Sequence, residues 1–330
     1  MRGSMPSSSG IRNLLAVVYG AAIRVRDTLY DIGALPVRAV PSVVVSVGNI
    51  EAGGTGKTPF TMALVSILAS RGIRTCVVTR GYRGRLSGPV VVRPDHASEE
   101  VGDEALLMAR TLSVPVIKSP DRIRGALLAR VCCGAEVVVL DDGFQHRRIR
   151  RDLDIVLVSR DVSKERLLPA GPLREHAGAL ARAHHVVAMK GSGFPGLAAD
   201  LRPQCLVGTD GRTSSLDTLA GRSILAFCAI GRPEHFFGML KGMCSRLDRI
   251  AYPDHHRYTR GDVAAIMDRA SMADLIVTTE KDLVKIDPTW LSGIAERVRA
   301  VRVSLDMPGL EDIADGIEEL ARMRRVPGQG

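Results

Sequence analysis

The residues from Gly48 to Pro59 combine glycine, lysine and threonine in the order of a phosphate-binding loop. A β-branched run over 41–47 precedes this loop, and a segment with apolar residues at helical spacing follows it, as expected of a buried parallel strand and a helix. Glycines let backbone N–H groups close around phosphate, and the start of the helix favours negative charge. The predicted nucleotide-binding residues are Gly53, Gly54, Thr55, Gly56, Lys57 and Thr58.

One position departs from the strict pattern of such loops. The pattern G-x-x-x-x-G-K-[ST] requires glycine where this chain has Glu51. The strand before the loop and the helix after it still indicate phosphate binding. Lys57 is expected to reach the β- and γ-phosphates, and the Thr58 hydroxyl is expected to hold Mg²⁺.

A second apolar run, 136–142, ends in Asp141 and Asp142. In open parallel sheets ligands bind at the carboxyl ends of the strands, so these carboxylates are expected beside the phosphate loop. One of them would hold Mg²⁺ directly or through water. The motif Asn-Lys-x-Asp, which reads guanine, is absent because asparagine occurs only at Asn13 and Asn49. ATP is therefore favoured as the nucleotide.

Three further loops rich in charge follow apolar, strand-like segments, at residues 79–85, 143–151 and 167–175. A parallel sheet could gather all three at one edge, where their arginines would suit an anionic substrate. The alternative is that each loop carries solvated surface arginines. Their occurrence beside a phosphate-binding loop favours a kinase of a small anionic molecule.

The chain resembles the tetraacyldisaccharide 4′-kinase family of lipid A biosynthesis, in strings spread from about Val43 to Lys285. These strings are VGNIEAGGTGKTP, TRGYRGR, VGDE, DDGFQHRRIRRDLDIVLV, LLPAGPLRE, AIGRPEHFF, YPDHHRYT and TTEKD. The resemblance implies a phosphotransferase that acts on an alcohol group and moves the γ-phosphate of ATP to the 4′-hydroxyl of tetraacyldisaccharide 1-phosphate. The family commonly has asparagine where this chain has Arg232.

The resemblance also implies roles for individual residues. Asp103 matches the position that the family uses as general base, and His255 matches the histidine that works with it, although His256 is its neighbour in the sequence. With Lys57 these two form the expected catalytic set. The expected metal ligands are Thr58, Asp141, Asp142 and Glu175. The expected substrate-binding residues are Tyr82, Arg122, Gln145, His146 and Arg174. For 280–282 (Glu-Lys-Asp) the sequence indicates only a cap at a strand–helix turn.

Composition narrows the class of partner. The 330 residues carry a formal net charge of +9, which favours an anionic partner, and only 4% are aromatic, which argues against single-strand nucleic-acid binding on stacked rings. The six cysteines include no C-x-x-C pair, which is typical of small buried side chains in a reducing compartment. We expect no nucleic-acid partner and no obligate protein partner; ATP and Mg²⁺ are the expected cofactors.

These motifs need a two-lobed α/β protein to position them. We expect a P-loop NTPase-like fold, with a parallel sheet flanked by helices, a smaller second α/β domain and an N-terminal amphipathic helix. The expected divisions are 1–35 for the tail and helix, 36–208 for the nucleotide-binding domain and 209–330 for a second domain that completes the cleft. Residues 203–217 are the expected linker. Helices are expected over 233–247 and 262–270.

The first 35 residues offer two interpretations. Residues 1–10 form a polar tail, and 14–23 are an apolar run too short to cross a membrane, for which about 20 residues are needed. A helical stripe with arginines beside it is typical of a helix in a membrane surface, or of one packed on its own domain. The first interpretation places the protein peripherally on the anionic, cytoplasmic face of the bacterial inner membrane. The stripe consists of Ile11, Leu14, Leu15, Val18, Ala22, Val25 and Leu29.

An alternative function is a partner-switching P-loop ATPase of the partitioning or metal-insertion type. Such proteins also combine a glycine-rich loop with a membrane-seeking helix. They often have lysine, rather than glutamate, near the position of Glu51. Transfer of phosphate to a lipid, as opposed to release of inorganic phosphate, distinguishes the two functions.

Overall fold

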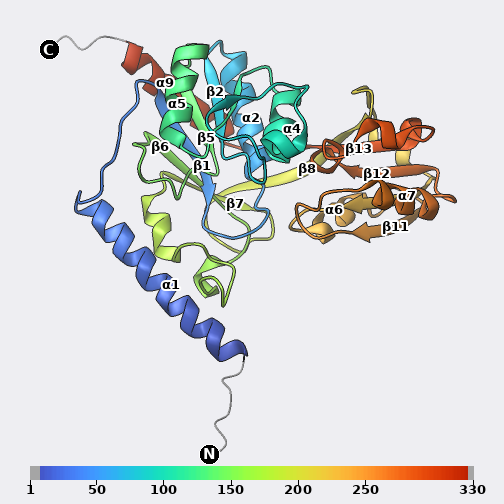
Figure 1. Ribbon diagram of the computed structural model, residues 1–330, viewed down its shortest axis with the longest axis horizontal. Coiled ribbons are helices and arrows are strands. Elements are labelled where there is room, and N and C mark those ends of the chain that lie inside the picture. Colours follow the sequence, from blue (N-terminus) through green and yellow to red (C-terminus); the bar gives the residue numbers. More distant parts are fainter. Residues whose placement is uncertain (1–7, 326–330) are drawn as a thin grey trace, which may run out of the picture.

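The computed structural model describes residues 8–325 and has two lobes of unequal size joined by two long strands (Figure 1). The larger lobe is built on a sheet with the order β3-β4-β2-β5-β1-β6-β7-β8, parallel except for β3. Its strands are β1 (Val43–Asn49), β2 (Thr75–Thr79), β3 (Val90–Val91), β4 (Val116–Lys118), β5 (Val137–Asp141), β6 (Leu153–Val158), β7 (His185–Met189) and β8 (Leu197–Gly208).

Helices cover both faces of this sheet, as a parallel sheet requires. Alternate residues of β1 serve the two faces: Val43, Val45 and Val47 belong to one core cluster, and Val44 belongs to the other. The first face is covered by α2 (Lys57–Ser70), α4 (Asp103–Thr111) and α9 (Leu310–Arg325), and the second by α5 (Arg122–Cys133). The short helix α3 (Ser98–Val101) directly precedes α4.

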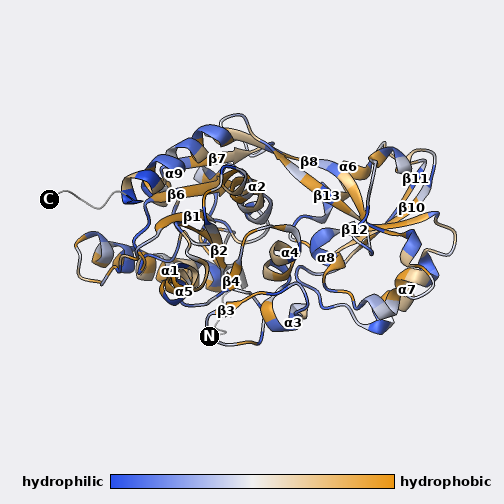
Figure 2. Ribbon diagram, turned by 90° about the horizontal axis from the view of Figure 1, so that it is seen from above, coloured by the Kyte–Doolittle hydropathy of each residue, from blue (hydrophilic) through white to orange (hydrophobic). Residues whose placement is uncertain are grey.

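The smaller lobe continues from the far end of β8. Its strand order is β11-β10-β12-β13-β8, in which only β13 and β8 pair antiparallel along this path. The apolar strand cores of both lobes and the narrow region between them are visible in Figure 2. The elements are β9 (Thr213–Ser214), β10 (Ser223–Cys228), α6 (Pro233–Leu240), β11 (Arg246–Ala251), α7 (Arg260–Arg269), β12 (Leu275–Thr279), α8 (Glu280–Leu283) and β13 (Val298–Asp306). Short 3₁₀ turns occur at Val162–Lys164, Ala177–Arg182, Leu216–Leu219, Pro288–Leu291 and Ala295–Arg297.

The expected fold class is confirmed, but the C-terminal boundary differs from the expected one. After β13 the chain returns to the larger lobe, where α9 packs on α2 and β1 (Figure 1). Its buried residues recur at helical spacing and join the core beside Val43 and Phe60. Residues 310–325 therefore belong to the larger lobe. These buried residues are Leu310, Ile313, Ala314, Ile317 and Ala321.

The expected linker and one expected helix are also different. β8 runs on to Gly208, and Pro203 lies opposite Val303 where the register of β8 and β13 is irregular. Such an irregularity tolerates the missing N–H of proline, so residues 203–208 of the expected linker belong to a strand. The helix expected over 233–247 ends at Leu240, and Arg246 begins β11.

The N-terminal helix α1 (Ser8–Asp31) lies along the outside of the larger lobe, on the side of β6 and β7 (Figure 1). Residues 1–7 of the expected tail lie outside the described residues, and residues 8–10 are helical. The helix approaches the lobe closely at Gly20, where a Cβ would lie 2.7 Å from Leu167 Cδ1. Ala16 and Ile23 are buried on the same side, so α1 packs on the lobe through a narrow strip of small and apolar residues.

The predicted apolar stripe of α1 faces away from the protein. Leu14 is 66% exposed, and Val18 and Val25 are each 60% exposed, on the side of the helix opposite its contact with the lobe. The helix therefore packs on its own lobe through one face and presents an apolar face to the outside. Within residues 8–325, no helix combines the length and the hydropathy needed to cross a membrane.

Candidate active site

The phosphate-binding loop opens into a cavity of about 1110 Å³ between the two lobes. Gly53 and Gly56 adopt positive φ values of 104° and 87°, which a side chain would oppose, and α2 begins directly at Lys57. All six predicted nucleotide-binding residues line this cavity. From the smaller lobe, Gly231 approaches so closely that a Cβ there would lie 2.8 Å from the Gly54 nitrogen.

The two carboxylates after β5 have different environments. Asp142 lines the cavity, has a positive φ of 56°, and lies 3.4 Å from Lys57 Nζ and 3.1 Å from an Arg174 nitrogen. Burial alone would raise the pKa of Asp142, but the charges of Lys57 and Arg174 lower it to about 2. Asp141 is buried, accepts hydrogen bonds from Thr61 and Thr79, and has its pKa raised to about 7, mainly by burial.

Four of the predicted substrate-binding residues, Tyr82, Gln145, His146 and Arg174, line the same cavity. Gln145 donates a hydrogen bond of 2.8 Å to the Asn49 carbonyl at the end of β1. Burial and the nearby Arg122 charge lower the pKa of His146 to about 4, so its imidazole is neutral. The loops after β1, β2, β5 and β6 meet at one sheet edge because their strands are parallel.

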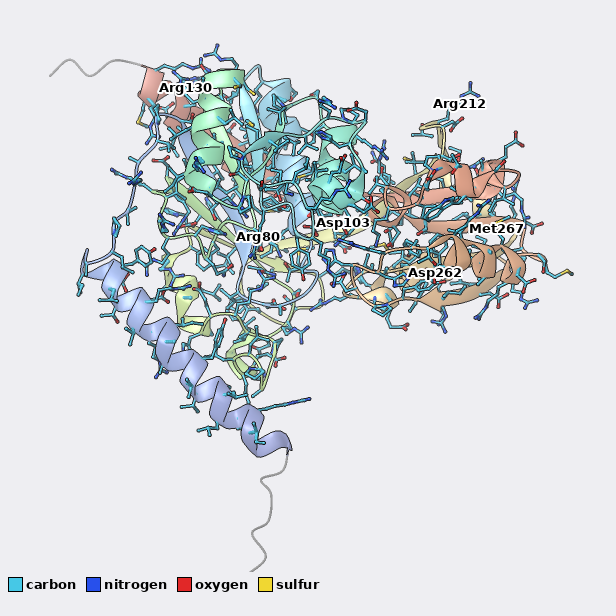
Figure 3. The ribbon with its side chains drawn as sticks, in the orientation of Figure 1. Arg80, Asp103, Arg130, Arg212, Asp262 and Met267 are labelled. Atoms are coloured by element: carbon cyan, nitrogen blue, oxygen red, sulfur yellow. The ribbon has the colours of Figure 1, made fainter. Side chains whose placement is uncertain are left out.

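His255, rather than His256, meets Asp103. His255 Nδ1 lies 2.9 Å from Asp103 Oδ2 across the junction of the lobes, where Figure 3 places Asp103. His256 instead lies 3.2 Å from Asp262. Burial alone would raise the pKa of Asp103, but the hydrogen bond with His255 and the charge of Lys281 lower it to about 2.

The two members of this pair have different access to the cavity. His255 lines the large cavity, whereas Asp103 lines a smaller adjoining pocket that shares Tyr82 and His255 with it. The Tyr82 and His255 rings meet edge to face, 5.0 Å between centroids. His255 therefore links the Asp103 carboxylate to the large cavity.

Residues 11–320 match the family model described as tetraacyldisaccharide-1-P 4′-kinase. The chain is 40% identical to the tetraacyldisaccharide 4′-kinase of Rhodopseudomonas palustris, over 82% of this chain and 81% of that protein. It is 39% identical to that of Nitrobacter winogradskyi, with 96% and 97% covered. The structure of LpxK from Aquifex aeolicus in complex with ATP matches with a TM-score of 0.77 and 33% identity, over 93% of this chain and 97% of that one.

The chain belongs to the tetraacyldisaccharide 4′-kinase family. It is an ATP-dependent kinase that phosphorylates a 4′-hydroxyl in lipid A biosynthesis. The family match covers nearly the whole chain and includes both lobes that line the cavity.

Arg122 and Glu175, expected at the kinase site, do not line the cavity. Arg122 is buried and donates to the carbonyls of Ser119 and Asp141, at 2.6 and 3.3 Å, so it supports the sheet edge from beneath. Glu175 is fully buried, and its two oxygens pair with Arg26 of α1 and with Arg182. Because its carboxylate is occupied in this way, Glu175 holds α1 in place and is not offered to a metal ion.

The two departures noted in the sequence, Glu51 and Arg232, meet in space. Glu51 is fully buried and accepts hydrogen bonds of 2.7 Å from the backbone and hydroxyl of Ser159 and one of 3.0 Å from Arg160. Arg232, from the smaller lobe, donates to Ser159 and lies 3.7 Å from Glu51. Glu51 therefore anchors the loop to the end of β6 and to the other lobe.

Glu104 and Lys281 are cavity residues that the sequence did not single out for this site. Their side chains meet at 2.9 Å, from α4 of one lobe and α8 of the other. The expected cap is present, because the Thr279 hydroxyl accepts from the Asp282 nitrogen and Glu280 pairs with Arg302. The position of Lys281 two residues after the end of β12 is a signal of a site, but only the packing of the lobes shows what it faces.

Proposed function

We propose that Asp103 removes the proton of the 4′-hydroxyl of tetraacyldisaccharide 1-phosphate while the γ-phosphate of ATP is held by the P-loop. The observation that carries this assignment is the 2.9 Å contact between Asp103 and His255, which joins the two lobes beside the nucleotide cavity. The low pKa of Asp103 keeps it ionised at neutral pH, as an acceptor must be. His255 orients the carboxylate.

The transfer exchanges one phosphorus–oxygen bond for another. The 4′-oxygen forms a bond to the γ-phosphorus as the bond from that phosphorus to the β,γ-bridging oxygen breaks, and ADP leaves. The hydroxyl proton passes to the Asp103 carboxylate and then to solvent. Lys57 and the backbone N–H groups of Gly53–Thr58 neutralise charge that develops on the phosphates. Positioning and charge stabilisation supply most of the rate because the transition state is loose.

Mg²⁺ fits the residues at the carboxyl edge of β5. The Thr58 hydroxyl and the Asp142 carboxylate line the same cavity and are the hard oxygen ligands that Mg²⁺ prefers, with Asp141 directly behind them. When bound, Mg²⁺ would neutralise phosphate charge. Arg174, which pairs with Asp142, would hold that carboxylate in place before nucleotide binds.

The acceptor lipid would be bound by the cavity residues that the nucleotide does not use. Tyr82, Gln145, His146 and Arg174 line this cavity, and Tyr19 and Arg26 of α1 line it as well. An arginine and a neutral imidazole suit a sugar phosphate, and the α1 end of the cavity suits a lipid that is still partly in a bilayer.

The outward face of α1 would lie in the membrane surface. Its exposed aliphatic side chains lie opposite the face that packs on the larger lobe, and Arg12 and Arg24 are exposed as well. Such a helix buries its apolar face among lipid chains and its cations near anionic headgroups. We propose on this basis that the enzyme is bound peripherally at the cytoplasmic side of the inner membrane, where ATP is available.

Transfer of label from [γ-³²P]ATP to tetraacyldisaccharide 1-phosphate in detergent micelles tests the proposal. We expect labelled lipid with the wild-type chain, and a turnover lower by about 10²-fold or more with Asp103→Asn, because a positioned general base contributes on the order of 10²–10⁴. ATP binding, measured by calorimetry, should change little. Label found only as inorganic phosphate would instead support the partner-switching ATPase.

A further inference from the structure

Lys281 is the residue of the TTEKD segment for which the reaction as described has no use. It is the second residue of α8, directly after β12, and its ammonium group reaches out of the smaller lobe. Its Nζ lies 2.9 Å from Glu104 Oε1, 3.3 Å from His255 Nε2 and 3.9 Å from Asp103 Oδ2. It therefore contacts both the histidine and the carboxylates across the junction of the lobes.

These distances decide which nitrogen of His255 carries the proton. A lysine ammonium has three donors and no acceptor, so a nitrogen that it contacts must be an acceptor. Nε2 is then unprotonated, and in a neutral imidazole Nδ1 carries the hydrogen. That hydrogen points to Asp103 Oδ2 at 2.9 Å. The competing acceptor, Asp254 Oδ1, is 3.9 Å from Nε2 and is too distant to hold a proton there by a hydrogen bond.

We propose that Lys281 is a positioning residue which keeps Nε2 of His255 unprotonated, so that the imidazole stays neutral and donates Nδ1–H to Asp103, and the carboxylate accepts the hydroxyl proton. This inference rests on the proposed function of the Asp103–His255 pair. Without Lys281, Nε2 would be free to act as a base toward the cavity, as the histidine of a Ser-His-Asp triad does. Lys281 thus leaves proton acceptance to Asp103 and orientation of that carboxylate to His255.

The surroundings of both side chains hold them in this arrangement. His255 has a positive φ of 57°, a strained value for a residue with a side chain, and its backbone is tied to Ala229 and to the Arg83 guanidinium. Burial alone would lower the pKa of Lys281, but the carboxylates of Glu104, Asp103 and Asp254 raise it above its ordinary value. Lys281 is therefore a cation and a permanent donor.

The tautomer can be measured directly by NMR. The full chain, labelled with [¹⁵N]histidine in detergent, gives separate Nδ1 and Nε2 shifts for protonated and unprotonated ring nitrogens, and the His255 signals are those lost in His255→Gln. We expect a protonated Nδ1 and an unprotonated Nε2 in the wild-type chain, and additional protonation of Nε2 in Lys281→Met. A wild-type His255 with its proton on Nε2 would overturn the inference, whether or not any variant folds.

Lys285→Met is the matched control. Lys285 lies four residues further on and also lowers the pKa of Asp103, but its ammonium pairs with Asp282 at 2.6 Å and is not among the contacts of His255 Nε2. We expect its loss to leave Nε2 of His255 unprotonated. Equal protonation of Nε2 in both variants would mean that general loss of positive charge, rather than loss of the Lys281 contact, causes it.

Kinetics supply a second readout. Lys281→Met should lower kcat about tenfold with little change in the KM for ATP, because a second proton on the imidazole would make the Asp103 carboxylate a weaker base. Lys281→Arg should keep Nε2 unprotonated and restore part of kcat, since a guanidinium also donates. Labelled lipid together with a wild-type Nε2–H tautomer would refute this inference alone. Absence of labelled lipid would refute the proposed function alone.

Discussion

The three aspartates of the site differ in charge because their neighbours differ. Asp142 has Lys57 and Arg174 beside it and a pKa of about 2, whereas burial raises the pKa of the adjacent Asp141, which accepts from two hydroxyls, to about 7. Asp103 is nearly as buried, yet His255 and Lys281 keep its pKa at about 2. A buried carboxylate remains ionised only where donors or cations compensate for lost hydration.

The ionisation of Asp103 makes a testable contribution to stability. Its pKa is lower in the folded chain than its ordinary value of 3.8, so the folded state binds fewer protons than the unfolded state between these values. The contribution is complete above that range and is lost as the pH falls toward 2. Asp103→Asn should therefore be less stable than the wild type at about pH 7, by at most about 2 kcal/mol.

Urea denaturation at several pH values measures this effect. The difference in unfolding free energy between wild type and Asp103→Asn should shrink as the pH is lowered to about 3, because the wild-type carboxylate then loses its advantage. A difference that stays constant with pH would show that the variant is destabilised by packing and not by loss of the charge.

At the scale of secondary structure, α1 has two faces with separate partners. One face is fixed to the larger lobe by close packing at Gly20 and by the contact of Arg26 with the buried Glu175. The Tyr19 hydroxyl also donates to the carbonyl of Arg174, the residue that pairs with Asp142. The membrane-facing helix and the nucleotide site are therefore connected through one short loop.

The outward face of α1 can be tested with a matched pair of variants. Leu14→Asp/Val18→Asp places two charges on the exposed stripe and should lower binding to vesicles containing anionic lipid by tenfold or more, since charged groups do not enter the acyl region. Sedimentation with vesicles measures the bound fraction. Transfer to a substrate dispersed in detergent should be much less affected.

The control is Leu127→Asp/Val131→Asp on α5. These side chains are also four residues apart on a helix, are 43% and 83% exposed, and change the net charge equally. We expect normal vesicle binding. If both double variants lose binding to the same extent, the effect is one of net charge and the proposed orientation of α1 is wrong.

At the scale of the whole molecule, the chain crosses between the lobes twice, and α9 packs against β1 of the larger lobe. β8 leads into the smaller lobe, β13 leads back beside it, and α9 completes the core under β1. Arg71 of the larger lobe pairs with Asp315 of α9 at 2.6 Å, and Arg324 pairs with Asp152. The smaller lobe is thus inserted in the larger one and held at both ends.

This topology predicts that α9 contributes to the stability of the nucleotide-binding lobe. Ile317 is fully buried in the same core cluster as Phe60, so Ile317→Ala should lower the unfolding free energy by about 2–5 kcal/mol. Met323, on the same helix, is 60% exposed, and Met323→Ala should have little effect. Chemical denaturation followed by circular dichroism measures both. Equal stabilities would show that α9 is only loosely attached.

The sequence alone determined the local chemistry of this protein. The phosphate-binding loop could be predicted because a β-branched strand, glycines at fixed positions and Gly-Lys-Thr at a helix start act through neighbouring backbone atoms. The Asp141–Asp142 pair could be placed beside it because parallel strands end at a common edge. Fold class and the outline of α1 followed from periodicity, which depends on each element separately.

The tertiary structure decided what depends on residues distant in the chain. The sequence indicates that Glu175 is a metal ligand, but in the fold its carboxylate is occupied by Arg26 and Arg182. Lys281 gains a partner only because α8 lies against α4. The choice between His255 and His256, and the return of α9 to the larger lobe, were decided in the same way. Pairing of charges and filling of a core are set by the packing of whole lobes, which no local pattern contains.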